Sequence, residues 1–140
     1  TYLQQEKSLF PFVRNLLDTL QEEGYVVGLV TAANRSRVEQ EIDRFELRDK
    51  FATVVCFEDT NYKKPHPEPL LKALNQIRRE PSSTAYVGDR PEDIQMGRKA
   101  GAFTVAVQSD YGTLPILEEE EPDLLLPHAG HLPKHLWKMN

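Results

Sequence analysis

Residues 25–31 read Tyr-Val-Val-Gly-Leu-Val-Thr, an almost uninterrupted apolar run that ends in a hydroxyl side chain. A run of this length is typical of a buried strand, and a strand that is apolar on both faces favours a parallel sheet covered on both sides. Before it, apolar residues recur every three or four positions. This spacing predicts an amphipathic helix over residues 9–23, with Ser8 as its N-cap and Gly24 as its stop.

Helices and strands are expected to alternate over the rest of the chain, because apolar runs and helical periodicities follow one another between polar loops. The further strands are expected at residues 51–57, 85–88, 103–107 and 124–126. The further helices are expected at residues 36–45, from Pro67 or Pro69 to just before residue 81, at residues 91–100, and from about Pro133. The acidic run at residues 118–121 is expected to be a solvated loop. We therefore predict one α/β domain, a Rossmann-like parallel sheet with helices on both faces.

The composition narrows the classes of function. The 140 residues carry a formal net charge of −5, which argues against a general nucleic-acid-binding protein. The longest apolar run is far shorter than the roughly 20 residues that span a bilayer, and no leader-like segment opens the chain. We therefore expect a cytoplasmic protein that binds neither nucleic acid nor membrane. The chain starts at Thr1 rather than at a methionine, so we expect a processed or partial polypeptide.

Ligands bind at the carboxyl ends of the strands in an open parallel sheet, so the residues that follow each strand are the candidates for chemistry. Asp89 directly follows the strand at residues 85–88, and Asp93 lies in the first turn of the next helix. Two carboxylates at a strand end suit Mg²⁺, which takes one or two carboxylates together with water and phosphate oxygens. Alternatively, these acids only complement the helix dipole.

Two other positions could hold an anion. Thr31 ends its strand and is followed by Ala32, so a hydroxyl and a backbone N–H could bind a phosphate oxygen. Lys64 lies in Lys-Pro-His-Pro-Glu at residues 64–68, where prolines could aim its ammonium at a fixed point. Read alone, Thr31 could also be an ordinary end of a strand, and Lys64 part of a solvated basic loop.

Taken in order, these motifs resemble those of the haloacid dehalogenase-like hydrolase superfamily. Residues 30–31 are similar to its second motif, Lys64 with residues 65–68 to its third, and Gly-Asp-Arg-Pro-Glu-Asp-Ile at residues 88–94 to its fourth. The tail from residue 111 to residue 124 resembles the end of the phosphoglycolate-phosphatase-like members. The likeness covers nearly the whole chain.

The resemblance implies phosphoryl transfer through an aspartyl phosphate. Thr31 and the amide of Ala32 would hold the transferring group, Lys64 would neutralise charge, and Asp89 with Asp93 would hold Mg²⁺. An anionic carboxylate that approaches an anionic phosphate meets about 4 kcal/mol of repulsion at 4 Å and an effective dielectric near 20. A lysine and a divalent cation offset that repulsion.

The family's first motif, Asp-x-Asp-Gly-Thr, is not in this sequence. Asp-Tyr-Gly-Thr-Leu at residues 110–114 is no substitute, because it lacks the second aspartate and follows the fourth motif. In the family the nucleophile precedes the second motif, on a strand between those that end in Thr31 and Asp89. We therefore expect the cap and this strand to lie upstream of Thr1, or another segment or partner chain to complete the sheet. The 140 residues alone should be inactive.

Two classes of function remain. The first is a Mg²⁺-dependent phosphatase that acts on a small phosphorylated metabolite. The second is a non-catalytic relative, which binds phosphate and metal or serves as a regulatory module. A dehalogenase fits less well, because that branch of the family uses no Mg²⁺.

Overall fold

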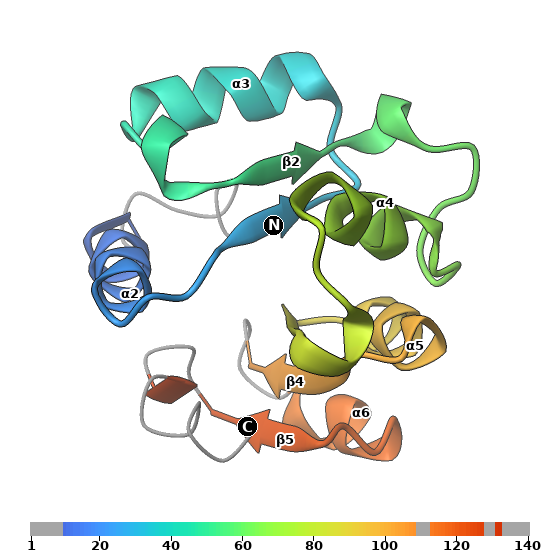
Figure 1. The fold of residues 1–140 in the computed structure, drawn as a ribbon. Coiled ribbons are helices and arrows are strands. Elements are labelled where there is room, and N and C mark those ends of the chain that lie inside the picture. Colours follow the sequence, from blue (N-terminus) through green and yellow to red (C-terminus); the bar gives the residue numbers. More distant parts are fainter. Residues whose placement is uncertain (1–9, 109–112, 128–130, 133–140) are drawn as a thin grey trace.

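The computed structural model describes residues 10–108, 113–127 and 131–132. Its helices and strands alternate along the chain, as the sequence predicts (Figure 1). The strands are β1 (Gly28–Val30), β2 (Thr53–Val55), β3 (Ala85–Gly88), β4 (Phe103–Val107) and β5 (Leu124–Leu126). The helices are α2 (Phe10–Glu22), α3 (Arg35–Arg44), α4 (Glu68–Ile77), α5 (Pro91–Ala100) and α6 (Leu114–Glu119). Single 3-10 turns lie at Arg48–Lys50, Phe57–Asp59 and Pro81–Ser83.

Helix α6 corrects one expectation, because the acidic run was predicted to be a loop from residue 118 onward. The helix includes Glu118 and Glu119 and ends before Glu120. It forms because Leu117 is buried among Ile94, Ala106 and Leu125, so one apolar side chain anchors an otherwise acidic turn. The expected terminal helix from Pro133 and the segment at residues 110–112 lie outside the described residues.

All strand pairs in the described chain are parallel, which confirms the predicted α/β class. They form two groups, β1–β2 and β3–β4–β5, and no backbone pairing joins β1 to β3 within the described residues. The two groups lie in separate halves of the view in Figure 1. The strand β4 has a neighbour on each side and is almost entirely buried, whereas β1 and β3 are mostly half-buried. One edge of β1 and one edge of β3 are therefore unpaired within the described residues.

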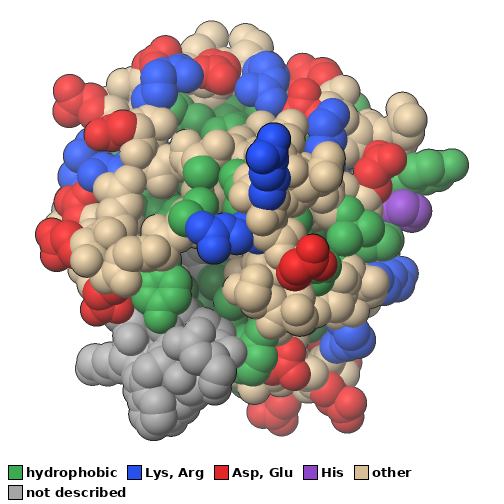
Figure 2. Space-filling view, in the orientation of Figure 1, with side chains coloured by type: hydrophobic (Ala, Val, Ile, Leu, Met, Phe, Trp, Pro, Cys, Tyr) green, Lys and Arg blue, Asp and Glu red, His purple; other side chains and the backbone are tan. Residues whose placement is uncertain are grey.

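Helices join the two groups on both faces. Helix α2 contributes Leu17 to the core beneath β1–β2 and Leu20 to the core around β4 and β5. On the other face, Leu70 and Leu74 of α4 pack with Met96 of α5. No helix of the described chain is both long and apolar enough to cross a bilayer. The face seen in Figure 2 carries basic and acidic side chains interspersed with one another.

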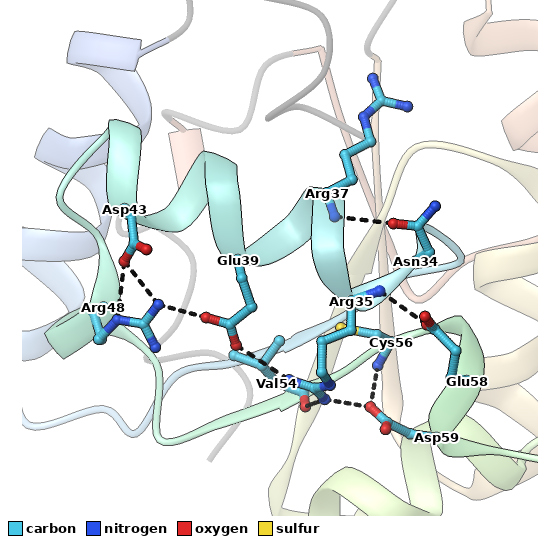
Figure 3. Close-up of polar contacts among 10 residues, drawn as sticks. All are labelled: Asn34, Arg35, Arg37, Glu39, Asp43, Arg48, Val54, Cys56, Glu58 and Asp59. Atoms are coloured by element: carbon cyan, nitrogen blue, oxygen red, sulfur yellow. Dashed lines mark hydrogen bonds and ion pairs between the residues drawn. The ribbon is translucent and has the colours of Figure 1, made fainter.

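The outer edge of β2 is closed by side chains (Figure 3). Arg35 donates a hydrogen bond to the carbonyl of Val54 at 3.0 Å, and Asp59 accepts one from the N–H of Cys56 at 2.7 Å. Arg35 and Asp59 also form an ion pair with each other. These two backbone groups face away from β1 and are already bonded, and no further strand pairs with β2 in the part of the chain that the structure describes.

Candidate functional site

Thr31 leaves β1 in a fixed orientation. Its N–H donates to the carbonyl of Val55 at 2.9 Å, and its hydroxyl oxygen accepts from the N–H of Ala33 at 3.1 Å. Thr31 as a whole residue is only 5% exposed, whereas the next residue, Ala32, is exposed. The chain then enters α3, where the side chain of Asn34 accepts a hydrogen bond from the N–H of Arg37 at 2.9 Å (Figure 3). The turn after β1 is therefore held by bonds on both sides of Ala32.

The loop that carries Lys64 is braced by Glu68 at the start of α4. One carboxylate oxygen of Glu68 accepts hydrogen bonds from the N–H groups of Asn61 at 2.7 Å and Tyr62 at 2.9 Å. The N–H of Glu68 donates to Nδ1 of His66 at 3.0 Å, and the ring of Tyr62 stacks on that of His66. The bond from Tyr62 lowers the pKa of Glu68. The Lys64–Pro65 peptide is cis.

The ammonium of Lys64 joins the two halves of the sheet. Its Nζ lies 2.6 Å from Oδ1 of Asp93, which follows β3, and 3.5 Å from the carbonyl of Val30, which ends β1. The side chain of Lys64 is 19% exposed and that of Asp93 is 7% exposed. An ion pair this shielded from water holds both groups in place, because either charge alone would be costly to bury. The carboxyl ends of β1 and β3 therefore meet at Lys64.

The other oxygen of Asp93 organises the turn after β3. Its Oδ2 accepts hydrogen bonds from the N–H groups of Asp89 at 3.2 Å and Arg90 at 3.3 Å, which caps the start of α5. This turn needs glycine at position 88, because a Cβ there would lie 2.2 Å from Cβ of Asp93. The carboxylate of Asp93 is thus engaged at both oxygens, and Asp89 is positioned through its backbone.

Tyr86 is a residue of this site that the sequence analysis did not single out. Its hydroxyl lies 3.4 Å from the carbonyl of Val30 and 3.5 Å from Oδ1 of Asp93. Burial, followed by the nearby carboxylate of Asp93, raises the pKa of Tyr86 well above its usual value. The phenol therefore stays protonated and can donate to either oxygen. No motif could reveal it, because Tyr86 reads only as one member of an apolar strand.

A pocket opens beside Lys64, and the space in and in front of it, open solvent included, amounts to about 240 Å³. All three residues predicted to bind phosphate line it together, namely Thr31, Ala32 and Lys64. The rest of its lining comes from Cys56, Phe57, Thr60, Lys63 and Pro69. Asp89 and Asp93 are not part of this lining.

The carboxylates after β3 are the candidate ligands for a divalent cation. No group of three His, Cys, Asp or Glu side chains gathers closely enough to hold a metal within the described residues. Mg²⁺ nevertheless needs only one or two protein carboxylates when a phosphate supplies further oxygens. Asp89, at the carboxyl end of β3, fits that requirement, whereas Asp93 is already bonded to Lys64 and to two amides.

Comparison with known proteins identifies the family of the chain. A family model described as haloacid dehalogenase-like hydrolase matches residues 1–107. The pyrophosphatase PpaX of Bacillus mycoides is 37% identical over 128 residues, which are 91% of this chain and 60% of that protein. The chain spans about 60% of the length of the curated relatives that it matches.

Solved structures share the fold. A haloacid dehalogenase-superfamily hydrolase of Ehrlichia chaffeensis superposes with a TM-score of 0.74 and 29% identity, over 89% of this chain and 56% of that one. A predicted phosphoglycolate phosphatase of Haemophilus somnus superposes with a TM-score of 0.81 over 89% of this chain and 55% of that one. Its identity is 23%, so this second likeness is evidence for the fold alone.

Proposed function

The chain belongs to the haloacid dehalogenase-like hydrolases, and from that premise we propose that it forms the greater part of a Mg²⁺-dependent phosphatase. The proposed substrate is a small phosphorylated metabolite, cleaved through an aspartyl phosphate in the cytoplasm. One observation carries the proposal. Lys64 lies between the carboxyl ends of β1 and β3, 2.6 Å from Asp93, and lines the same pocket as Thr31.

In this proposal, the phosphoryl group binds in the pocket where Thr31, Ala32 and Lys64 meet. The hydroxyl of Thr31 accepts from Ala33 but keeps its own proton to donate to a phosphate oxygen. The N–H of Ala32 belongs to an exposed residue in a braced turn, so it can donate without rearrangement of the backbone. Lys64 supplies the positive charge, and its pairing with Asp93 keeps the ammonium aimed at this point before substrate arrives.

The nucleophilic aspartate would enter on a strand between β1 and β3. Both strands have one free edge within the described residues, and both are mostly half-buried despite their apolar sequences. The carbonyl of Val30 points toward this edge, where its contacts to Lys64 and Tyr86 are long, at 3.5 and 3.4 Å. A strand placed there would have the carboxyl end of β1 on one side and that of β3 on the other. It would come from an upstream segment or from a partner chain.

Asp89 is the residue that would hold Mg²⁺ directly. Asp93 would support it by fixing the amides of Asp89 and Arg90 while it pairs with Lys64. When bound, the cation would offset the negative charge of the phosphate. The sequence suggests Asp89 and Asp93 as joint ligands of the cation. In this proposal, Asp89 is the ligand and Asp93 is a positioning residue.

The proposal is tested by replacing Lys64 in the full-length gene product that contains these 140 residues. We expect Lys64→Met to lower kcat/KM for Mg²⁺-dependent hydrolysis of p-nitrophenyl phosphate by about a hundredfold or more, because a charge aimed at the phosphoryl group is lost. Lys72→Met is the matched control, since Lys72 also donates to a loop carbonyl, that of Asp59, from an exposed position outside the pocket. It should stay within about twofold of the wild type. Equal activities of the two variants would reject the assigned site. A full-length protein that binds phosphate without hydrolysis would instead indicate the non-catalytic alternative.

A further inference from the structure

Tyr86 lies beside the ion pair of Lys64 and Asp93, yet the proposed function gives it no role. Its ring packs against the core cluster of Leu70, Leu74, Met96 and Ala102. The ring also lies close to α5, where a Cβ added at Gly97 would be 3.4 Å from Cβ of Tyr86 and 3.7 Å from its Cδ2. Packing therefore fixes the ring, and the hydroxyl is the polar end that reaches the site.

The hydroxyl of Tyr86 and the ammonium of Lys64 share the same two acceptors. Nζ of Lys64 lies 2.6 Å from Oδ1 of Asp93 and 3.5 Å from the carbonyl of Val30. The hydroxyl of Tyr86 lies 3.5 Å from that same Oδ1 and 3.4 Å from that same carbonyl. A phenol has one proton to donate and an ammonium has three. Lys64, at the shorter distance, is therefore the main donor to Asp93, and Tyr86 is a second donor within reach.

A phosphate in the pocket would draw Lys64 away from these two oxygens. Lys64 lines the pocket, whereas neither Asp93 nor Val30 does. An ammonium that moves toward a phosphate in the pocket lengthens its contacts to both oxygens. The side chain of Asp93 is only 7% exposed, so water has little access to replace the weakened bond. A buried acceptor that loses its donor costs free energy, and this cost would weaken phosphate binding.

We propose that Tyr86 is a positioning residue for phosphate binding, whose hydroxyl closes on Asp93 or Val30 as Lys64 turns to the phosphate. Neither buried oxygen then loses its donor. This inference rests on the proposed function, because the phosphate is the one assigned to Thr31 and Lys64. Tyr86 itself makes or breaks no bond of the substrate. Since Lys64 holds the phosphoryl group both in the bound substrate and in the transition state, Tyr86 should affect KM rather than kcat.

The test measures Tyr86→Phe in the full-length gene product, because phenylalanine fills the same space and lacks only the hydroxyl. We expect the dissociation constant of orthophosphate, measured by isothermal titration calorimetry, to rise about fivefold. The KM for p-nitrophenyl phosphate should rise by a similar factor, and kcat should stay within about twofold. Tyr25→Phe is the matched control, since Tyr25 is also half-buried but packs against the core around β4 and β5. It should leave all three constants within about twofold of the wild type.

A second measurement follows the hydroxyl itself. A phenol whose hydrogen bond tightens changes its near-ultraviolet absorption. Orthophosphate should therefore produce a tyrosine difference spectrum in the wild type and in Tyr25→Phe, and none in Tyr86→Phe. A wild type that binds orthophosphate without such a spectrum would overturn the inference, and so would a spectrum that persists in Tyr86→Phe.

The kinetic outcomes separate this inference from the phosphatase proposal. A fall in kcat as large as the rise in KM would overturn the positioning role, because it would mean that loss of the hydroxyl deforms the site. Orthophosphate binding that Tyr86→Phe leaves unchanged would overturn this inference alone. A wild type that binds no orthophosphate would overturn the phosphate site as well.

Discussion

Gly88→Ala is the substitution that most sharply tests how the turn after β3 is built. The new Cβ would lie 2.2 Å from Cβ of Asp93 and 2.7 Å from its Cγ, whereas carbon atoms in contact lie about 3.5–4.0 Å apart. The obstructing atoms belong to the base of the Asp93 side chain, so a simple rotation cannot clear them. The start of α5 must move away by roughly 1 Å or more, and Asp93 moves with it.

The loss of stability expected for Gly88→Ala follows from the hydrogen bonds and the ion pair that Asp93 makes. Overpacking a tight site costs about 1–3 kcal/mol, and hydrogen bonds to a charged group contribute about 1.5–3 kcal/mol. Because one displacement causes both losses, we do not add them and expect the free energy of unfolding to fall by about 3 kcal/mol. The shift also separates Asp93 from Lys64, now 2.6 Å apart, so orthophosphate binding should weaken at least about tenfold.

The assay is urea unfolding of the full-length gene product, together with orthophosphate titration of the folded protein. Gly28→Ala is the matched control, because its Cβ would meet the terminal methyl of Thr53 at 2.8 Å, far along the chain from Asp93. It should cost about 1 kcal/mol and leave phosphate affinity unchanged. If Gly88→Ala were as stable as the wild type within about 0.5 kcal/mol and bound phosphate equally well, our account of the turn would be refuted.

Two further predictions concern the loop and the edge of the sheet. Glu68→Gln removes a carboxylate whose pKa is lowered below 4.5 by the hydrogen bond from the N–H of Tyr62. Because its folded-state pKa is lowered, this carboxylate stabilises the fold above about pH 4.5. That stabilisation is lost as the pH falls through the folded-state pKa. Urea unfolding should show that the variant is less stable than the wild type at pH 7 and that the two free energies of unfolding converge in acid. A difference in free energy that grows in acid would contradict the bracing role of Glu68. Arg35→Ala uncovers the carbonyl of Val54 and should cost about 1 kcal/mol, allowing for solvent screening of a partly exposed group. Sedimentation should also show more self-association through β2; a variant that stays as monodisperse as the wild type would argue against the capping role.

The order of elements and the convergence of the site follow from local sequence. The helical spacing on either side of the apolar run at residues 25–31 predicts α2 and α3 within one residue, and the run itself predicts the place of β1. Polar residues that follow strands are expected at one end of a parallel sheet. The 2.6 Å contact between Lys64 and Asp93 agrees with that reasoning.

Other features depend on contacts that no local pattern contains. Glu68 was read as part of a proline-rich motif, but its carboxylate braces the loop through two backbone N–H groups. Tyr86 reads as a strand residue, yet its hydroxyl reaches Val30, 56 positions earlier in the chain. Sequence periodicity shows which face a side chain occupies. It does not show which distant polar atom that side chain will reach.

The lengths of the strands are also not predictable from local sequence alone. The apolar run at residues 25–31 predicts a longer strand than the three residues of β1. Backbone pairing decides where a strand begins and ends, and β1 has only β2 beside it within the described residues. The sequence indicates which residues favour a strand, whereas the extent of the strand depends on its neighbours.

The central claim is that Thr31, Lys64 and Asp89 form a phosphoryl-transfer site that works only when an aspartate-bearing strand lies between β1 and β3. The most direct measurement compares Mg²⁺-dependent hydrolysis of p-nitrophenyl phosphate by two preparations at equal concentration. One is the 140-residue chain alone, and the other is the same chain mixed with a peptide strand that ends in Asp-x-Asp-Gly-Thr. We predict no hydrolysis above background by the chain alone and measurable hydrolysis in the mixture, lost again with Lys64→Met. Turnover by the 140 residues without that strand would contradict the claim.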